Sequence, residues 1–389
     1  MQKGLIIYDI AIIGAGASGL MLASNLDKKK YKNICIIDTS SKLAPKIKVS
    51  GGAKCNITNE FVTHKNYLGD RDFAKKILEN FSKNELLAFL NKNGVFPKIN
   101  PKIVKGTYFC NSSQDVIDMF TKLTTHVKKY METKVLDVDF DGIYKIKTDF
   151  KTIEAKKLVV ASGGLSYSML GASSIGFDIA KKFGHTIEKL EPALVGFTVQ
   201  KEQFWFKNLS GISTNVESFI DGKTFEGSLL FAHKGCSGPV ILTTSLYWKK
   251  GKLAVDFLPK KKLESFLVGN KNISSALPLP KRFTQEFLNS IELEDKSISS
   301  LTKDEKEKLK VLKYYEFSPA GNFGYTKAEV TKGGVNTSEI NHDTFESLKQ
   351  KDLYFIGEVL DLTGELGGFN FQIAFSEAFI CAKELNKDK

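Results

Sequence analysis

The chain has 389 residues, of which 42% are hydrophobic and 26% are charged, and this composition is typical of a globular protein. No apolar run approaches the roughly 18 residues that a membrane-spanning helix needs, so we expect a cytoplasmic protein with no membrane partner. Five widely spaced cysteines without a CxxC pair argue against a disulfide framework or a zinc site, and no metal is expected.

The formal net charge of +12 comes almost entirely from lysine, because only two arginines are present. The lysines are scattered, with short runs at 28–30, 249–252 and 260–262. They are typical either of solvated faces in a lysine-rich chain or of a basic surface that attracts nucleic acid. Charge alone does not separate these two interpretations.

The first forty residues predict a strand, a glycine turn, a helix and a second strand. YDIAII (8–13) and NICIID (33–38) read as the strands, and GAGASG (14–19) between them matches a GxGxxG dinucleotide fingerprint. Its glycines allow a tight turn, close approach to a pyrophosphate and close helix packing, while an acid at the end of the second strand binds ribose hydroxyls. The predicted dinucleotide site consists of Gly14, Ala15, Gly16, Ala17, Ser18, Gly19 and Asp38.

The remaining segments predict an α/β fold with an insertion. SGGAKCNITN (50–59) is too polar and glycine-rich for a strand or a helix, whereas 73–93 predicts one or two helices and 113–130 another. Short alternating segments over 134–160 predict a β-meander that ends in a buried strand. We expect a Rossmann-like FAD-binding domain, a parallel βαβ sheet with this meander, interrupted by an inserted β-rich domain with a small helical piece. The predicted boundaries are 1–190 and 326–389 for the FAD domain and 191–325 for the insert, β-rich over 191–259 and helical over 260–313.

Two later segments favour FAD over NAD. KKLVVASGG (156–164) resembles the strand end of FAD-binding two-dinucleotide-fold proteins, and LYFIGE (353–358) resembles their second FAD motif, whose acid hydrogen-bonds the ribityl chain. The helix after GELGGFN (364–370) would stabilise negative charge on the reduced flavin. No second GxGxxG is present, so NAD(P)H would dock transiently. These resemblances add Ala161, Ser162, Gly163, Gly357, Glu358, Gly367, Gly368, Phe369 and Asn370 to the expected FAD contacts.

The stretches SGGAKCNITN, FAHKGCSGP (231–239), TKGGV (331–335) and IGEVLDLTGELGGFNFQIAFS (356–376) occur in an order that resembles the BaiN/RdsA-like FAD-dependent oxidoreductases. The resemblance implies flavin-mediated reduction with NAD(P)H as the electron source. The implied substrates are steroid-like enones or uridine in ribosomal RNA, which becomes dihydrouridine. Three positions depart from the family pattern, namely Ser162 in place of Thr, Ala53 in place of Gly, and SEAF (376–379), which lacks a glycine.

Both activities need a hydride from reduced flavin for a conjugated C=C bond and a proton donor for the neighbouring carbon. Cys55 is the candidate donor, because in related flavoproteins the glycine-rich stretch follows the pyrophosphate to the flavin and a thiol is mostly protonated at neutral pH. Cys55 as a small packed residue is the alternative. The same stretch adds Ser50, Gly51, Gly52 and Asn56 to the expected cofactor contacts, and Lys46 would either neutralise pyrophosphate or lie solvated at the surface.

His233 in FAHKGCSGP is the second catalytic candidate, as a polarising group or acid, against the alternative of a structural turn histidine. The main functional hypothesis is an NAD(P)H-linked FAD reductase acting on ribosomal RNA uridine or a small cyclic enone. A flavoprotein oxidase and an RNA-associated flavoprotein that acts mainly by binding are the alternatives. The sequence leaves open the choice of NADH or NADPH and the oligomeric state.

Overall fold

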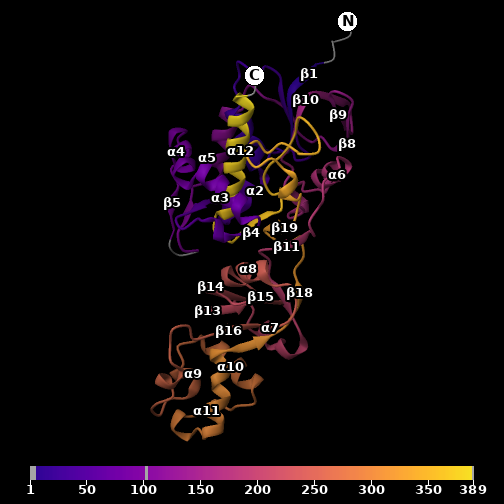
Figure 1. The fold of residues 1–389 in the computed structure, drawn as a ribbon. Helices are drawn as coiled ribbons and strands as arrows, with labels where there is room; N and C mark the ends of the chain where they lie inside the picture. Colours follow the sequence, from indigo (N-terminus) through magenta and orange to yellow (C-terminus); the bar gives the residue numbers. More distant parts are fainter. Residues whose placement is uncertain (1–5, 101–103, 388–389) are drawn as a thin grey trace. The chain divides into compact units, whose positions relative to one another are not determined.

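The structure is a computed structural model that describes residues 6–100 and 104–387, and the chain divides into two units. The first unit consists of Met1–Pro192 and Val330–Lys389, and the second is Ala193–Glu329 (Figure 1). The chain leaves and rejoins the first unit through β11 (Glu191–Ala193) and β19 (Val330–Lys332), which pair with each other. None of the helices in the described residues has the length and apolar character needed to cross a bilayer.

A parallel sheet forms the centre of the first unit, as predicted. Strand β2 (Ile34–Ile37) is buried along its whole length, which is typical of a strand covered on both faces. A meander of β8 (Val135–Phe140) and β9 (Tyr144–Thr148) joins the sheet antiparallel to its central long strand. The parallel strands, in spatial order, are β7 (Lys128–Tyr130), β2 (Ile34–Ile37), β1 (Ile7–Ile13), β10 (Thr152–Val160) and β20 (Leu353–Phe355).

Helices flank this sheet, and α1 (Ala17–Asn25) packs against the long C-terminal α12 (Phe369–Lys387) (Figure 1). The helical prediction for 73–93 is confirmed as two helices, because Asp70 and Ser82 each cap a new N-terminus. The prediction for 113–130 is wrong at its end, since residues 128–130 pair with β2 as strand β7. The other helices are α2 (Pro45–Val49), α3 (Arg71–Asn80), α4 (Lys83–Lys92), α5 (Ser113–Leu123) and α6 (Ile175–Lys182).

The prediction that 50–59 contains no strand is also wrong in its second half. Ser50–Ala53 forms a short 3-10 turn, but Asn56–Asn59 is strand β3, which pairs with β6 (Thr107–Phe109). The polar side chains are buried there because they have partners: Thr58 Oγ1 donates to Gln372 Oε1 at 2.5 Å, and Asn59 Nδ2 donates to the Gly367 carbonyl at 3.1 Å. The neighbouring small pairs are β5 (Lys98–Ile99) with β6 and β4 (Tyr67–Gly69) with β21 (Leu362–Gly364).

The second unit contains an antiparallel sheet, which confirms the predicted β-rich insert. Its helices are α7 (Trp205–Asn208), α8 (Pro239–Tyr247), α9 (Ile273–Ala276), α10 (Lys281–Ser290) and α11 (Lys303–Leu309). Aromatic side chains from α7, α10 and the sheet fill its core, with Trp205 Nε1 donating to the Tyr315 hydroxyl at 3.1 Å. The strands, in spatial order, are β17 (Tyr315–Phe317), β16 (Leu253–Asp256), β13 (Ser213–Ile220), β14 (Lys223–Ala232), β15 (Gly235–Ser237), β12 (Phe197–Val199) and β18 (Pro319–Asn322).

Candidate cofactor site

The carboxyl ends of four parallel strands meet at one edge of the first unit's sheet. Their registers place Ile13 opposite both Ile37 and Val160, and Val160 opposite Phe355. The residues that follow these strand ends are therefore neighbours, and they are the predicted cofactor residues Gly14, Asp38, Ala161 and Gly357. Ligands of open α/β sheets bind at this kind of edge.

The glycines of the fingerprint have separate roles. At Gly14, with φ of +111°, a Cβ would lie 2.3 Å from the Ala161 carbonyl oxygen, and at Gly19 it would lie 2.0 Å from the Gly14 carbonyl oxygen. At Gly16 it would meet no protein atom within 4 Å. Gly14 and Gly19 are thus required by the fold itself, whereas Gly16 borders open space beside the N-terminus of α1. The N–H groups of the first helical turn lack intrahelical partners, so this space suits a pyrophosphate.

Asp38 connects the second strand to the glycine turn. Its Oδ2 accepts a hydrogen bond from the Ala15 amide at 2.6 Å, and its Oδ1 accepts one from the Ser40 amide at 2.7 Å. Burial raises the pKa of the Asp38 carboxyl, and the two amide hydrogen bonds oppose that rise. Each carboxylate oxygen keeps a further acceptor position, which is what a ribose hydroxyl needs. The sequence analysis missed that Asp38 also holds the turn.

Ser162, directly after Ala161, has a buried hydroxyl without a hydrogen-bond partner among the described residues. Its Oγ points toward α6, where a Cβ at Gly176 would lie 2.1 Å away, so a hydrogen bond to a bound ligand would require the Ser162 side chain to rotate. Next to it Gly163, with φ of +73°, faces no protein atom within 4 Å of a would-be Cβ. The open directions at Gly16 and Gly163 together fit a bound dinucleotide such as FAD.

Lys46 and Glu358, both predicted cofactor contacts, contact each other. Lys46 Nζ lies 2.6 Å from Glu358 Oε2, while Glu358 Oε1 accepts a hydrogen bond from the Thr331 amide at 2.9 Å. Thr331 Oγ1 in turn accepts a hydrogen bond from the Leu165 amide at 2.8 Å, so it joins the β10 strand end to Glu358. Thr331 was missed as a site residue, although it begins the TKGGV stretch. Lys46 is paired here and is not a solvated surface cation.

Two glycine-rich loops contact the paired strands β3 and β6 at the predicted flavin end. Gly51 and Gly52 adopt φ values of 56° and 63°, and a Cβ at Gly368 would lie 2.5 Å from the Thr58 carbonyl oxygen. Asn370 accepts a hydrogen bond from the Gly364 amide at 2.8 Å and donates one to the Gly364 carbonyl at 2.9 Å. Asn370 therefore shapes the turn before α12, whose N-terminus is the predicted stabiliser of negative charge. Phe369 is buried and packs beneath this turn against Tyr67.

Ser50 and Asn56, the other two residues predicted to contact the cofactor here, are both partly exposed. The Ser50 hydroxyl donates to the Ile47 carbonyl at 2.9 Å, so the structure uses it to close the turn after α2. Asn56 begins β3 beside Cys55. Their cofactor contacts stay predictions.

Cys55 lies between the 50–53 turn and β3, with no exposed surface and a φ of +51°. Burial, and secondly the nearby Cys110, raise the pKa of its thiol, which therefore stays protonated as a proton donor must. A donor must also touch its substrate, and a fully buried side chain does not do so in this conformation. Burial thus weighs against the donor role, which stays a prediction.

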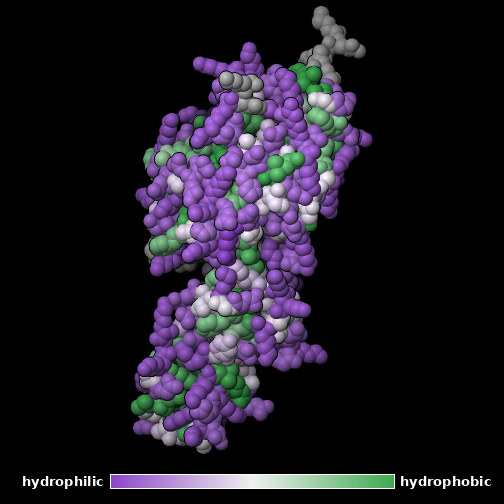
Figure 2. All heavy atoms as spheres, in the orientation of Figure 1, coloured by the Kyte–Doolittle hydropathy of each residue, from purple (hydrophilic) through white to green (hydrophobic). Residues whose placement is uncertain are grey.

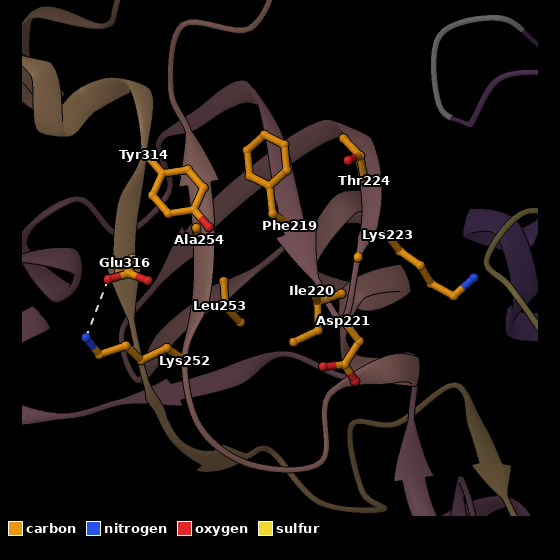
Figure 3. A pocket seen from close by; sticks show the side chains of 11 residues that line it. Phe219, Ile220, Asp221, Lys223, Thr224, Lys252, Leu253, Ala254, Tyr314 and Glu316 are labelled. Carbon is orange, nitrogen blue, oxygen red and sulfur yellow. Dashed lines mark hydrogen bonds and ion pairs between the residues drawn. The ribbon is translucent and has the colours of Figure 1, made fainter.

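His233 belongs to the second unit, where it is exposed in the turn between β14 and β15. Its catalytic role stays a prediction. The same unit carries a hollow of about 340 Å³ at one end of β13 and β16, where the Phe219 and Tyr314 rings lie near Ala254 (Figure 3). Lys252 and Glu316 form an ion pair in its lining, so the hollow presents mixed charge and no single ligand class.

Glu377 is a site residue that the sequence analysis missed. It projects from α12 and is 1% exposed, and its Oε2 accepts a hydrogen bond from the Gly357 amide at 2.5 Å. Burial raises the pKa of this carboxyl to about 8. The available signal was an acid in SEAF, inside the run FQIAFSEAFICA, in which Gln372 and Ser376 are the other polar residues. Through this hydrogen bond Glu377 fixes the turn at Gly357, the residue directly before Glu358.

Comparisons with known proteins place this site in context. A family model described as the HI0933-like protein Rossmann domain matches residues 8–384. The chain is 36% identical to a ribosomal RNA dihydrouridine synthase of Escherichia coli K12, covering 97% of this chain and 98% of that protein. It is 27% identical to a 3-dehydro-bile acid delta(4,6)-reductase of Clostridium scindens, covering 96% and 98%.

Among solved structures, the chain is similar to a 3-ketosteroid delta1-dehydrogenase from Sterolibacterium denitrificans, crystallised with 1,4-androstadiene-3,17-dione. The TM-score is 0.52 at 11% identity, and the match covers 98% of this chain and 100% of that chain. At this identity the likeness concerns the fold alone.

Proposed function

The chain belongs to the HI0933-like Rossmann family, and on this premise we propose that it is an FAD-dependent reductase that converts uridine in ribosomal RNA to dihydrouridine, with NAD(P)H as electron donor. The reaction adds a hydride to one carbon of the uracil C=C bond and a proton to the other. As an enzyme of ribosomal RNA it would act in the cytoplasm. Similarity at 36% identity over nearly the full length of a ribosomal RNA dihydrouridine synthase is the observation that carries this choice.

The chain's own residues support the FAD part of the proposal. Gly16 and the first turn of α1 would receive the pyrophosphate, Asp38 the ribose, and the Ser162 hydroxyl a polar atom of the cofactor. Glu358, oriented by Lys46 and the Thr331 amide, would accept a hydrogen bond from the ribityl chain. When bound, FAD supplies the two electrons of the reduction as a hydride.

The chain must also stabilise charge and deliver a proton. The N-terminus of α12 offers a partial positive charge to the reduced cofactor. Cys55, kept protonated by burial, is the proposed proton donor, and a small movement of the 50–53 turn would be needed to bring it to the substrate. His233 is the second proposed acid or polarising group.

A small cyclic enone is the second candidate substrate, and the similarity to the bile acid reductase favours it. Its lower identity, 27% against 36%, ranks it behind RNA. The two substrates share the chemistry, because both present a C=C bond conjugated to a carbonyl. They differ in charge, since RNA brings phosphates that attract lysine and a steroid-like enone brings none.

The test uses purified holoenzyme with ribosomal RNA from cells that lack this gene. Before the reaction, we expect nucleoside mass spectrometry to find the dihydrouridine missing in this RNA from the gene-deleted cells. After the reaction, we expect it to detect dihydrouridine only when NADPH or NADH was supplied. An enzyme that reduces a cyclic enone but forms no dihydrouridine in this RNA, with NADPH or with NADH, would favour the second candidate. Flavin reduction by NAD(P)H that is followed only by oxygen consumption would instead indicate an oxidase, and normal RNA binding without any turnover would indicate a binding protein.

A further inference from the structure

An aromatic and basic surface lies beside the candidate cofactor site, on the edge of the small sheet formed by β3, β6 and β5. Phe61, Phe96 and Ile99 are apolar yet 56%, 60% and 44% exposed. Figure 2 shows apolar spheres among hydrophilic ones at the edge of the first unit where Figure 1 labels β5. We call the set Phe61, Phe96, Ile99, Lys54, Lys98 and Lys105 the hairpin surface.

Positive charge on this surface is not neutralised by the protein. Lys54, Lys98 and Lys105 form no ion pair with any carboxylate of the described residues, and Lys105 Nζ lies 5.4 Å from the centre of the Phe61 ring. The nearby acid, Glu60, is already engaged by Lys83 Nζ at 3.1 Å and by the Tyr108 hydroxyl at 2.5 Å. Lys105 therefore presents a free cation next to the exposed Phe61 ring, and a cation beside an aromatic face is the combination that binds single-stranded nucleic acid.

Strand β6 and the residue Val104 before it, which enclose Lys105 of the hairpin surface in the chain, adjoin both glycine loops of the candidate site. A Cβ at Gly367 would lie 2.8 Å from Val104 Cγ1 and 2.9 Å from Thr107 Oγ1, and a Cβ at Gly51 would lie 2.9 Å from Phe109 Cε1. The Cys110 amide donates to the Lys54 carbonyl at 2.9 Å, which keeps Lys54 at the end of β6. A strand of RNA on this surface would thus lie next to the place where reduction is proposed.

RNA chemistry explains why aromatic faces are useful here. A uridine inside a stacked helix cannot reach a flavin, so the reacting base must leave the stack, which leaves its neighbours without stacking partners. We propose that the hairpin surface holds single-stranded RNA flanking the reacting uridine, with Phe61 and Phe96 stacking on bases and Lys54, Lys98 and Lys105 neutralising phosphates. This inference rests on the proposed function, and adds to it where the RNA is held.

The test measures binding of a labelled single-stranded, uridine-containing RNA oligonucleotide to the holoenzyme by fluorescence anisotropy at several salt concentrations. We expect F61A/F96A to raise Kd by about thirtyfold or more, from lost stacking on two bases. We expect K98E/K105E to raise Kd at least about tenfold and to lower the slope of log K against log salt by about 0.7 per lysine. FAD content and NAD(P)H-driven flavin reduction should stay unchanged in both, since neither variant alters a cofactor contact.

Matched controls lie near the start of β10, the end of this strand that is opposite to the candidate cofactor site. Phe150 is 57% exposed with a lysine near its ring, like Phe61, and Lys134 and Lys147 are exposed lysines without an ion pair among the described residues. F150A and K134E/K147E should change Kd less than about twofold. Wild-type binding by the hairpin variants, or an equal loss in the controls, would overturn the inference.

Turnover separates this inference from the proposed function. If the wild-type enzyme forms dihydrouridine while the hairpin variants bind and modify RNA normally, the hairpin surface is wrong and the proposed function stands. If the hairpin variants lose RNA binding but the wild-type enzyme forms no dihydrouridine, the surface stands and the proposed reaction is wrong.

Discussion

Lys46 Nζ lies 2.6 Å from Glu358 Oε2, although 312 positions separate the two residues. The pair joins α2, which follows the first βαβ unit, to the turn after β20 near the C-terminus. We expect Glu358→Gln to lower FAD affinity about tenfold, because the acceptor loses its charge and its ion pair with Lys46 while the side chain keeps its size. Titration of apoprotein with FAD measures this, and unchanged affinity would remove Glu358 from the cofactor contacts.

Lys46→Met is the companion variant. The pair is partly exposed, with 31% and 21% of the two side chains accessible, so its loss should cost the apoprotein less than about 1 kcal/mol. A larger effect on FAD affinity than on urea unfolding would indicate that Lys46 orients Glu358 for the cofactor. Equal effects on both would indicate a purely structural pair.

Gly16→Val should abolish FAD binding and leave the fold intact. A Cβ at Gly16 meets no protein atom within 4 Å, and the φ of −84° suits any residue, so the new side chain would fill only the space assigned to the pyrophosphate. Gly19→Ala is the contrasting variant, because its Cβ would lie 2.0 Å from the Gly14 carbonyl oxygen and would destabilise the fold itself. Flavin absorbance and thermal unfolding measure both, and a Gly16→Val protein with normal flavin content would refute the cofactor placement.

Ser162→Ala should act in opposite directions on stability and on binding. The Ser162 hydroxyl is buried without a partner among the described residues, so its removal should leave the apoprotein unchanged or up to about 1 kcal/mol more stable. If the hydroxyl bonds to FAD, affinity should fall about fivefold or more. Urea unfolding of the apoprotein and FAD titration separate the two effects. A less stable apoprotein with normal FAD affinity would mean that Ser162 serves only the fold.

The sequence predicted the parts of the fold that local patterns encode. The β-branched runs of β1 and β2, with the glycines between them, predicted the parallel sheet, and the alternation over 134–160 predicted the meander. Where long-range pairing decides, the prediction failed. Lys128–Tyr130 continues a helical pattern, but it is a strand because Cys35–Ile37 is available to pair with it. Asn56–Asn59 is a strand because Gln372 and the Gly367 carbonyl form hydrogen bonds with its polar side chains.

The same division applies to the candidate site. Gly14, Asp38 and Ala161 follow strands whose in-register ends place them together, so chain order and a motif were enough to predict them. Thr331 and Glu377 were missed because their roles are contacts with Glu358 and Gly357, which no local pattern reports. The sequence left the burial of Cys55 as one of two alternatives, because it depends on the pairing of the following strand β3 with β6, which no local pattern reports.

Cys55→Ala tests the proposed proton donor. We expect the variant to retain FAD and to be reduced by NAD(P)H at the normal rate but to lose turnover of RNA uridine by about a hundredfold or more, the usual contribution of a general acid. Cys110→Ala is the matched control, because Cys110 is a neighbouring buried thiol with no proposed role in proton transfer. Normal turnover by Cys55→Ala, measured as dihydrouridine formed per minute, would remove Cys55 from the mechanism and leave it as a packed residue.

Glu377→Gln should change how stability depends on pH. In the folded protein, burial raises the pKa of Glu377 from 4.5 to about 8, so the folded state binds a proton that the unfolded chain has released. Stability from this group is therefore complete below about pH 4.5 and is lost as pH rises toward about 8, at up to about 1.4 kcal/mol per pH unit.

Glutamine is neutral at every pH and can still accept the Gly357 hydrogen bond. Urea unfolding at about pH 5.5 and about pH 7.5 should show the wild type losing roughly 2 to 3 kcal/mol relative to Glu377→Gln, at equal FAD concentration. A constant difference between the two proteins would mean that Glu377 keeps the same charge in the folded and unfolded states.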